Sequence, residues 1–477
     1  MSIHAEVEKS IEQSLADVLL NQYEAFRETP CAGAALRRER LRRLKQMLVE
    51  NKEAICKAID ADFSGRSFHE TLNAEYLPSI MALNDALAHV KGWMKPKHKL
   101  APWLFQPAMA KVVAQPLGIV GIIVPWNYPL YLAIGPLIGV LAAGNHAMIK
   151  MSEYSPQFGR LFAELTEHYF PQSLITVING QLDVARAFSA LPFDHLLFTG
   201  STAVGKQVMR AASENLTPVT LELGGKSPVV IDRSMPISEA AERLVFPKCL
   251  NAGQTCVAPD YVLCPEEQVD EFIQRFLAET KRQYGDLTLN KDFSNVINSV
   301  QRERLIDYVE EAKAAGAKVY IAGDSDNLDD YGDKLPLILL KDVPTCCKVM
   351  TEEIFGPVLP VVEYTDLPDA LQYINSRPHP LALYVFGYDA ELRQLFEQRT
   401  QSGALLFNEA LIHVAMENLP FGGVGASGMG QYHGKYGFDT FSKFKPVVSK
   451  ERISTLKLMY PPYKSWLLNV LLKLLRG

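Results

Sequence analysis

The chain has 477 residues, of which 48% are hydrophobic and 21% charged, a balance typical of a globular protein of two or three domains of roughly 150 residues each. Its formal net charge of −6 argues against a protein that holds nucleic acid through phosphate contacts. Seven cysteines without a C-x-x-C pair argue against a disulfide framework, and the acidic N-terminus lacks the apolar run of a signal peptide, so we expect a cytoplasmic protein.

The first ninety or so residues are charged and carry a helical pattern without a clear strand. Beyond a proline-containing junction near residue 95, short apolar runs alternate with amphipathic stretches. Strands separated by helices pair in parallel through crossover connections, so we expect an α/β unit. Pro136 is expected to kink or split one of its helices. The strands are predicted at 118–126, 145–152, 173–179 and 193–200, and the helices at 129–144 and 156–170.

A second unit repeats this alternation from about Ser227. The predicted fold is therefore α/β, with two doubly wound parallel-sheet domains that join near "LELGGKSP". In the second unit, strands are predicted at 227–232, 260–264, 318–322, 383–388 and 403–408, and helices at 238–250, 266–284, 302–315 and 368–375.

One strand-to-helix turn, "FDHLLFTGSTAVGKQVMR" (193–210), contains Gly200-x-x-x-x-Gly205-Lys206. Gln207 stands where a nucleoside triphosphatase loop needs Ser or Thr to ligate Mg²⁺. The dinucleotide pattern G-x-G-x-x-G is not met either, because no glycine lies between Gly200 and Gly205. A plain turn that needs glycine only for its backbone angles is the third interpretation. The N-terminus of the following helix nevertheless offers free N–H groups to an anion.

Three further segments combine polar side chains with apolar surroundings. In "VPWNYPL", Asn127 follows a buried strand, where it is either a helix cap or a hydrogen-bond donor in a site. In "LELGGKSP", Glu222 lies beside two glycines. In "NAGQTCVAPDYV", Cys256 follows a helix and is a candidate thiolate nucleophile. No histidine lies near these segments and none of the ten forms a metal-binding cluster, so we predict neither a thiol hydrolase nor a metal site. The other six cysteines are interpreted as buried packing residues.

Seven motifs taken together resemble those of the NAD(P)-dependent aldehyde dehydrogenase superfamily, over nearly the whole chain to about residue 446. They are "PWNYP", "IKMSE", "FTGSTAVGK", "LELGGKSP", "GQTCVAPDYV", "EEIFGPVLP" and "NLPFGGVGASGMGQYHGKYGFDTFS". The fifth and seventh resemble the class 3 branch, which includes fatty aldehyde and coniferyl aldehyde dehydrogenases. The resemblance implies a Rossmann-like cofactor domain and a catalytic domain.

The resemblance also implies a catalytic role for three residues. Cys256 attacks the aldehyde carbon as a thiolate, and the resulting oxyanion accepts hydrogen bonds from the Asn127 amide and the Cys256 backbone N–H. Loss of a hydride then leaves a thioester. Glu222 activates the water that hydrolyses it, as a general base.

For the cofactor, the resemblance implies that Lys150 and Glu153 contact the adenosine ribose. Glu153 disfavours a 2′-phosphate and Lys150 favours one, so NAD is expected and NADP remains open. Gly200, Ser201 and the helix that they open are expected to meet the pyrophosphate. The full set of implied cofactor-binding residues is Trp126, Lys150, Glu153, Gly200, Ser201, Gly205, Glu353 and Phe355.

The resemblance further implies a homodimer and a division of the chain. The expected division is an NAD(P)-binding domain at 1–95 and 117–223, a catalytic domain at 224–425, and an oligomerisation segment at 96–116 and 440–450.

Residues 461–477 are predicted to form an amphipathic helix with cationic ends, which could lie on a membrane, cover the substrate funnel or pack on a partner subunit.

The expected substrate is a hydrophobic or aromatic aldehyde, because the loop at 409–420 is apolar in places. Coniferyl-type aldehyde is the first expectation and a medium- or long-chain aliphatic aldehyde the second. Two alternatives stay open: a non-redox cysteine thioesterase or acyl transferase, and an inactive structural homologue. Aldehyde-dependent formation of reduced nicotinamide distinguishes the main hypothesis from both.

Overall fold

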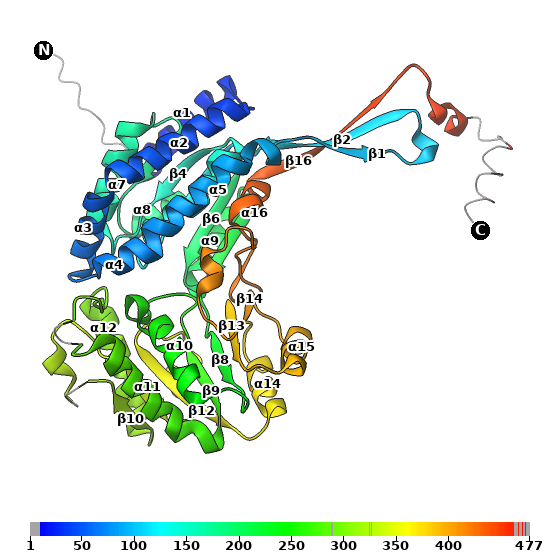
Figure 1. Cartoon of the computed structure of the whole chain (residues 1–477). Coiled ribbons are helices and arrows are strands. Elements are labelled where there is room, and N and C mark those ends of the chain that lie inside the picture. Colours follow the sequence, from blue (N-terminus) through cyan, green and yellow to red (C-terminus); the bar gives the residue numbers. More distant parts are fainter. Residues whose placement is uncertain are drawn as a thin grey trace, which may run out of the picture.

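The structure of the chain is a computed structural model that describes residues 10–287, 290–323, 325, 327–461, 466, 470 and 473. The helix predicted at 461–477 falls largely outside the described residues. Within the described residues, no helix combines the length and the apolar character needed to cross a bilayer. Two α/β units and a long arm make up the described chain (Figure 1).

The first unit contains a six-stranded sheet in the order β15-β7-β6-β3-β4-β5, parallel except for β15. The strand order reverses beside β3 and β6, where doubly wound sheets form their ligand crevice. Its strands are β3 (Ile119–Ile123), β4 (His146–Lys150), β5 (Ile175–Ile178), β6 (His195–Gly200), β7 (Val219–Leu223) and β15 (Gly428–Met429).

Helices cover both faces of this sheet, so β3 and β4 are buried throughout. Ile119 and Ile123 face one hydrophobic core, and Val120 and Ile122 face the other. One face carries α1 (Ile11–Glu28), α8 (Leu182–Ser189) and α9 (Thr202–Ser213). The other carries α2 (Ala34–Glu50), α3 (Lys52–Phe63), α5 (Leu77–Trp93), α6 (Tyr131–Ala143), α7 (Pro156–Tyr169) and α16 (Gly434–Thr440).

The second unit contains a seven-stranded sheet in the order β10-β11-β12-β9-β8-β13-β14, in which only the pair β10–β11 is antiparallel. Two doubly wound sheets confirm the predicted α/β fold class. The strands are β8 (Pro228–Ile231), β9 (Tyr261–Pro265), β10 (Lys318–Ile321), β11 (Ile338–Lys341), β12 (Val358–Tyr364), β13 (Ala382–Phe386) and β14 (Ala404–Phe407). The principal helices are α10 (Ile237–Cys249), α11 (Val269–Tyr284), α12 (Ser299–Ala314), α14 (Leu367–Asn375) and α15 (Ala390–Arg399).

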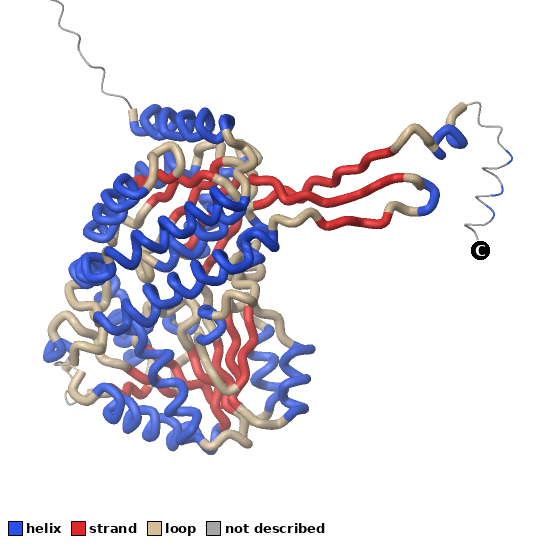
Figure 2. Tube along the Cα trace, turned by 45° about the horizontal axis from the view of Figure 1, so that its top comes forward, coloured by secondary structure: helices blue, strands red, loops and turns tan. Residues whose placement is uncertain are grey.

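A three-stranded antiparallel sheet forms an arm that projects from the body (Figure 2). It consists of β1 (Lys97–Leu100), β2 (Ala108–Pro116) and β16 (Ser442–Lys450), with β2 in the middle. The register joins Ser442 to Pro116 and Lys450 to Ala108. Segments more than 300 residues apart in the sequence therefore build the arm together.

The helix predicted at 129–144 differs from expectation in one respect. It forms as α6, with Pro136 inside it and no break. Every residue of α6 except Gly135 is buried, and the surrounding core stabilises the helix although proline cannot donate a backbone hydrogen bond.

Candidate active site

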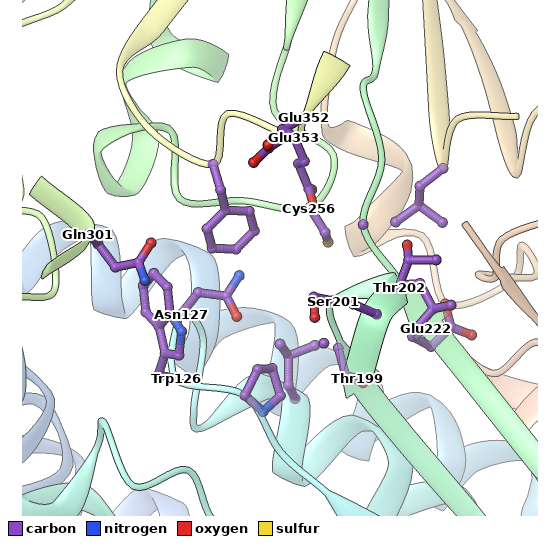
Figure 3. A pocket seen from close by; sticks show the side chains of 18 of the residues that line it. Trp126, Asn127, Thr199, Ser201, Thr202, Glu222, Cys256, Gln301, Glu352 and Glu353 are labelled. Carbon is purple, nitrogen blue, oxygen red and sulfur yellow. The ribbon is translucent and has the colours of Figure 1, made fainter. Parts of the chain in front are cut away.

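The site is a cavity of about 550 Å³ between the two units. Residues that follow β3, β6 and β7 line one side of it, and residues from the second unit line the other. Figure 3 shows the side chains of Asn127, Glu222 and Cys256 around this cavity, with Trp126 and Ser201 nearby. The three residues proposed as catalytic thus come together from positions 127, 222 and 256 of the sequence.

A strained turn presents Cys256 to the cavity. α10 ends at Cys249, and Asn251 and Ala252 then adopt left-handed backbone angles with φ of 54° and 51°. Gly253 continues at φ 72°, where a Cβ atom would lie 2.4 Å from the carbonyl oxygen of Gly356, so only glycine fits. Left-handed non-glycine residues cost free energy and cluster at functional sites.

The thiol of Cys256 is half-buried, and burial raises its pKa to about 12, with smaller contributions from the carboxylates of Glu353 and Glu222. The backbone N–H groups of Cys256 and Val257 oppose this shift. A sulfur in this environment is mostly protonated at neutral pH, so thiolate chemistry here needs a nearby proton acceptor or a positive charge.

Glu222 lies in β7, one residue before the strand ends, and is only 3% exposed. Neither carboxylate oxygen has a hydrogen-bond partner among the described residues. Burial without a partner raises the pKa of this carboxyl well above its ordinary value. A partnerless carboxyl at a cavity wall has both oxygens available to a water molecule or substrate.

Asn127 does not cap a helix, because α6 begins only at Tyr131 and its N-cap residue is Leu130. The side-chain nitrogen of Asn127 instead donates a hydrogen bond of 3.1 Å to the carbonyl oxygen of Gln254. An amide nitrogen carries two hydrogens, so one N–H remains for the cavity that Asn127 lines.

A second cavity, of about 860 Å³, extends from the first along β4 and α9. Lys150 and Glu153 line it. The buried ammonium of Lys150 donates to the carbonyl oxygens of Met151 at 2.7 Å and Gly180 at 2.8 Å, and burial lowers its pKa. Its third N–H remains available. The two cavities share Pro125, Trp126, Thr199, Gly200 and Ser201.

The connecting wall suits a pyrophosphate. Ser201 is the N-cap of α9, and its hydroxyl accepts a hydrogen bond from the N–H of Val204. A Cβ atom at Gly200 would lie 2.5 Å from the Phe198 ring, so glycine keeps this turn open. Gly205 lines neither cavity: a Cβ there would lie 2.6 Å from Leu223, and the glycine instead lets α9 pack on β7. The continuous groove with an anion site at its centre fits a dinucleotide.

Glu353 and Phe355 belong to the second unit, between β11 and β12, and line the first cavity. Burial raises the pKa of Glu353 to about 8, while a backbone N–H of Gly225 opposes the shift. The Phe355 ring meets Trp126 edge to face, with centroids 5.4 Å apart. Its φ of 49° is a rare backbone angle for a residue with a side chain, so the surrounding structure holds it in place.

A third cavity, of about 380 Å³, shares Cys256 with the first and lies away from the dinucleotide groove. Glu409 to Ala415, part of the loop predicted to border the substrate, contribute to its wall except for His413. Its aromatic lining carries no chemical signature in the sequence, although several of these residues lie within or next to the seven family motifs. The aromatic lining residues are Tyr128, Tyr131, Phe246, Phe421 and Tyr432.

The remaining cysteines behave as predicted with two exceptions. Cys56, Cys249, Cys264 and Cys347 are buried, whereas Cys31 and Cys346 are exposed, contrary to the packing role expected for them. None of the six lines the three cavities described above.

Comparisons with known proteins agree with this geometry. Residues 2–447 match the family model "Aldehyde dehydrogenase family". A probable coniferyl aldehyde dehydrogenase of Pseudomonas aeruginosa is 50% identical over 460 residues, which cover 96% of each chain. Aldehyde dehydrogenase family 3 member A2 of Rattus norvegicus is 39% identical over 442 residues, which cover 92% of this chain and 90% of the relative.

Two solved structures extend the comparison. The substrate-bound state of Staphylococcus aureus AldH matches with a TM-score of 0.91 and 36% identity, over 96% of this chain and 98% of that one. A Mycobacterium tuberculosis aldehyde dehydrogenase complexed with NAD⁺ matches with a TM-score of 0.82 and 27% identity, over 92% and 91%. The chain therefore belongs to the aldehyde dehydrogenase family, in its class 3-like branch, and is an enzyme that oxidises aldehydes.

Proposed function

We propose that the enzyme oxidises hydrophobic or aromatic aldehydes, coniferyl aldehyde foremost, to carboxylic acids with NAD(P)⁺ through a thiohemiacetal and a thioester on Cys256. One observation carries the proposal. The Cys256 thiol lies between a groove that fits a dinucleotide and an aromatic-lined cavity, with a partnerless carboxyl and an amide donor on the same wall.

Each of the three side chains has one task. Cys256 loses its thiol proton, and the thiolate sulfur bonds to the aldehyde carbon while the C=O π bond breaks. The free N–H of Asn127 together with the backbone N–H of Cys256 donates to the oxygen that becomes negative. When bound, the nicotinamide supplies a hydride acceptor. Glu222 then takes a proton from the water that attacks the thioester, the bond between the acyl carbon and the Cys256 sulfur breaks, and the carboxylic acid and the Cys256 thiolate are released.

The non-redox alternatives receive less support from this geometry. A thioesterase or acyl transferase has no use for a groove of about 860 Å³ that fits a dinucleotide. An inactive homologue has no need to keep a partnerless buried carboxyl, which costs free energy.

We infer that the residues around the second cavity hold the cofactor as NAD in preference to NADP. Glu153 lines the cavity where an adenosine ribose fits, and the ammonium of Lys150 is largely occupied by two carbonyl oxygens. The Glu153 carboxylate accepts from ribose hydroxyls and repels a 2′-phosphate.

Glu153→Gln is therefore expected to raise kcat/KM with NADP relative to NAD by about tenfold, because the repulsive charge is removed. Steady-state kinetics with both cofactors measure the ratio. Glu164→Gln, on the exposed side of α7, is the matched control and leaves the ratio unchanged. An unchanged ratio in Glu153→Gln would place the discrimination elsewhere.

The third cavity supports hydrophobic or aromatic aldehydes as the substrate class, because its wall combines five aromatic rings with aliphatic side chains. Aromatic rings pack favourably edge to face or offset against such walls. The relatives named as coniferyl aldehyde dehydrogenases support the same class. We expect kcat/KM for coniferaldehyde to exceed that for hexanal by about tenfold or more. A kinetic panel of benzaldehyde, coniferaldehyde and C6 to C16 aldehydes tests this, and a maximum at a long aliphatic chain would select the second substrate class.

We propose that residues 96–116 and 440–450, which form the arm, hold two copies of the chain together as a homodimer. The rest of the chain divides into a cofactor domain at 1–95 and 117–223 and a catalytic domain at 224–425. Among the residues that the structure describes, β1 and β16 each leave one edge of the arm without a partner strand, and the side chains of Leu100, Met109 and Val448 are exposed; both features support the homodimer.

We also propose reversible membrane contact through residues 461–477. The end of the arm, from which this segment continues, exposes Trp103 and Ile453. Residues 95–116 and 442–460 carry nine Lys or Arg and one Glu, which favours an anionic surface. The full chain should sediment together with anionic vesicles, and a variant that lacks residues 461–477 should stay in the supernatant. Equal sedimentation of both forms would overturn this proposal.

A further inference from the structure

A buried ion pair lies behind Asn127, in the helical region that the sequence marked only as charged. The side chain of Arg66 is fully buried, and its guanidinium lies 4.8 Å from the centroid of the Phe63 ring and 4.9 Å from that of Tyr128. One of its nitrogens is 3.4 Å from a carboxylate oxygen of Glu75, which is also fully buried.

The pair contacts both ends of the short segment that carries Asn127. Arg66 donates a hydrogen bond of 2.6 Å to the carbonyl oxygen of Asn127. Glu75 accepts from the backbone N–H of Leu130 at 2.8 Å and of Tyr131 at 3.2 Å, where α6 begins. The two charges therefore fix the peptide before and after the turn that aims the Asn127 amide.

A second set of hydrogen bonds ties the same turn to the loop of Cys256. The Asn251 amide donates to the carbonyl oxygen of Asn127 at 3.1 Å and to that of Gln254 at 3.1 Å. The Asn127 amide donates to the same Gln254 oxygen. Arg66 thus shares its acceptor with the loop that presents Cys256, two residues beyond Gln254.

The pair is costly as a device for stability alone. Among the described residues, Nε and Nη2 of Arg66 and one oxygen of Glu75 have no hydrogen-bond partner, although Nη2 and that oxygen belong to the ion pair. Well-packed apolar residues often stabilise a core better than a buried ion pair does. Glu75 also lies in a π-helical turn, Leu72–Tyr76, a rare geometry that is frequent at functional sites.

We propose that Arg66 and Glu75 are positioning residues for the oxyanion donor Asn127. They line none of the three cavities and act through the backbone that follows the Asn127 side chain, at the carbonyl oxygen of Asn127 and at the N–H groups of Leu130 and Tyr131. The inference rests on the proposed covalent mechanism, in which that amide must reach the developing oxyanion. A displacement of about 1 Å in such a contact costs about 10²-fold in rate.

Arg66→Lys and Glu75→Gln test the proposal in the full-length enzyme. Lysine keeps the charge but lacks the planar fork that reaches two partners, and glutamine keeps the shape but not the charge. We expect kcat for aldehyde oxidation to fall about 10- to 100-fold in each, with KM for the cofactor unchanged. Alkylation of Cys256 by iodoacetamide, which forms no oxyanion, should keep its rate within about twofold.

Arg37→Lys is the matched control. Arg37 is equally buried, at 3% exposed, and donates to the carbonyl oxygens of Ala32 at 2.7 Å and Ala142 at 2.9 Å, at the opposite end of α6. Its replacement should lower the thermal midpoint while leaving kcat unchanged. An equal loss of kcat in Arg37→Lys, or a parallel loss of alkylation rate in the Arg66 and Glu75 variants, would show that the pair is merely structural.

A double-mutant comparison separates this inference from the proposed function. Asn127→Ala should itself lower kcat, and adding Glu75→Gln to it should lower kcat no further, because the residue being positioned is gone. Additive losses would overturn the positioning role while leaving Asn127 as the donor. An unchanged kcat in Asn127→Ala would instead overturn the oxyanion assignment, and the positioning role with it.

Discussion

Cys256→Ala is expected to abolish aldehyde-dependent formation of reduced nicotinamide, with kcat lowered by about 10⁴-fold or more, because no other side chain supplies the sulfur that bonds to the carbonyl carbon. Absorbance at the reduced-nicotinamide wavelength measures this loss. Binding of NAD⁺ should persist, since Cys256 borders the groove only at its far end.

Cys249→Ala is the matched control, because Cys249 is fully buried at the end of α10 and lines none of the cavities described above. It should retain activity. Substantial turnover in Cys256→Ala would exclude covalent catalysis by this sulfur. Aldehyde- and nicotinamide-independent thioester hydrolysis by the unmodified enzyme would instead support the non-redox alternative.

Glu222→Gln is expected to separate oxidation from hydrolysis. Without the carboxylate, the thioester forms once and then persists, so a burst of one reduced nicotinamide per active site precedes a steady rate lower by about 10²- to 10⁴-fold. Rapid-mixing absorbance measures both phases. The double variant with Cys256→Ala is the control and should show no burst.

The pH dependence of activity also distinguishes Glu222→Gln from the unmodified enzyme. Burial raises the pKa of Glu222 well above its ordinary value and that of Cys256 to about 12, and both groups act in their deprotonated forms. The activity of the unmodified enzyme should therefore rise with pH above the range in which an ordinary carboxyl titrates. In Glu222→Gln the steady rate should lose the part of this rise that the carboxylate supplies. A falling profile in the unmodified enzyme would contradict both assignments.

Periodicity predicted the parallel strands of both units where their residues are uniformly apolar, as in β3 and β4. It missed β7, because Glu222 interrupts its apolar pattern and the segment looked like a domain junction. It also missed β12, where Pro360 lies inside the strand. Proline normally argues against a central strand, yet β12 pairs in parallel with β11 and β9.

The candidate site shows a similar limit. The motifs singled out Cys256, Glu222 and Asn127, which line one cavity in the structure. Local pattern could not tell that Asn127 precedes α6 by four residues rather than capping it. The motif glycine Gly205 proved to serve helix packing. Arg66 and Glu75 carried no signal, because a charged residue looks the same in the sequence whether its side chain faces solvent or a buried partner.

The central claim is that the aldehyde becomes a thioester on Cys256 whose hydrolysis depends on Glu222. Peptide mass spectrometry of Glu222→Gln, quenched in acid after mixing with coniferaldehyde and NAD⁺, tests it most directly. The account predicts that the peptide containing Cys256 gains the mass of the corresponding acyl group, in proportion to the burst of reduced nicotinamide. A full burst with Cys256 unmodified, or the acyl group on another residue, would contradict it.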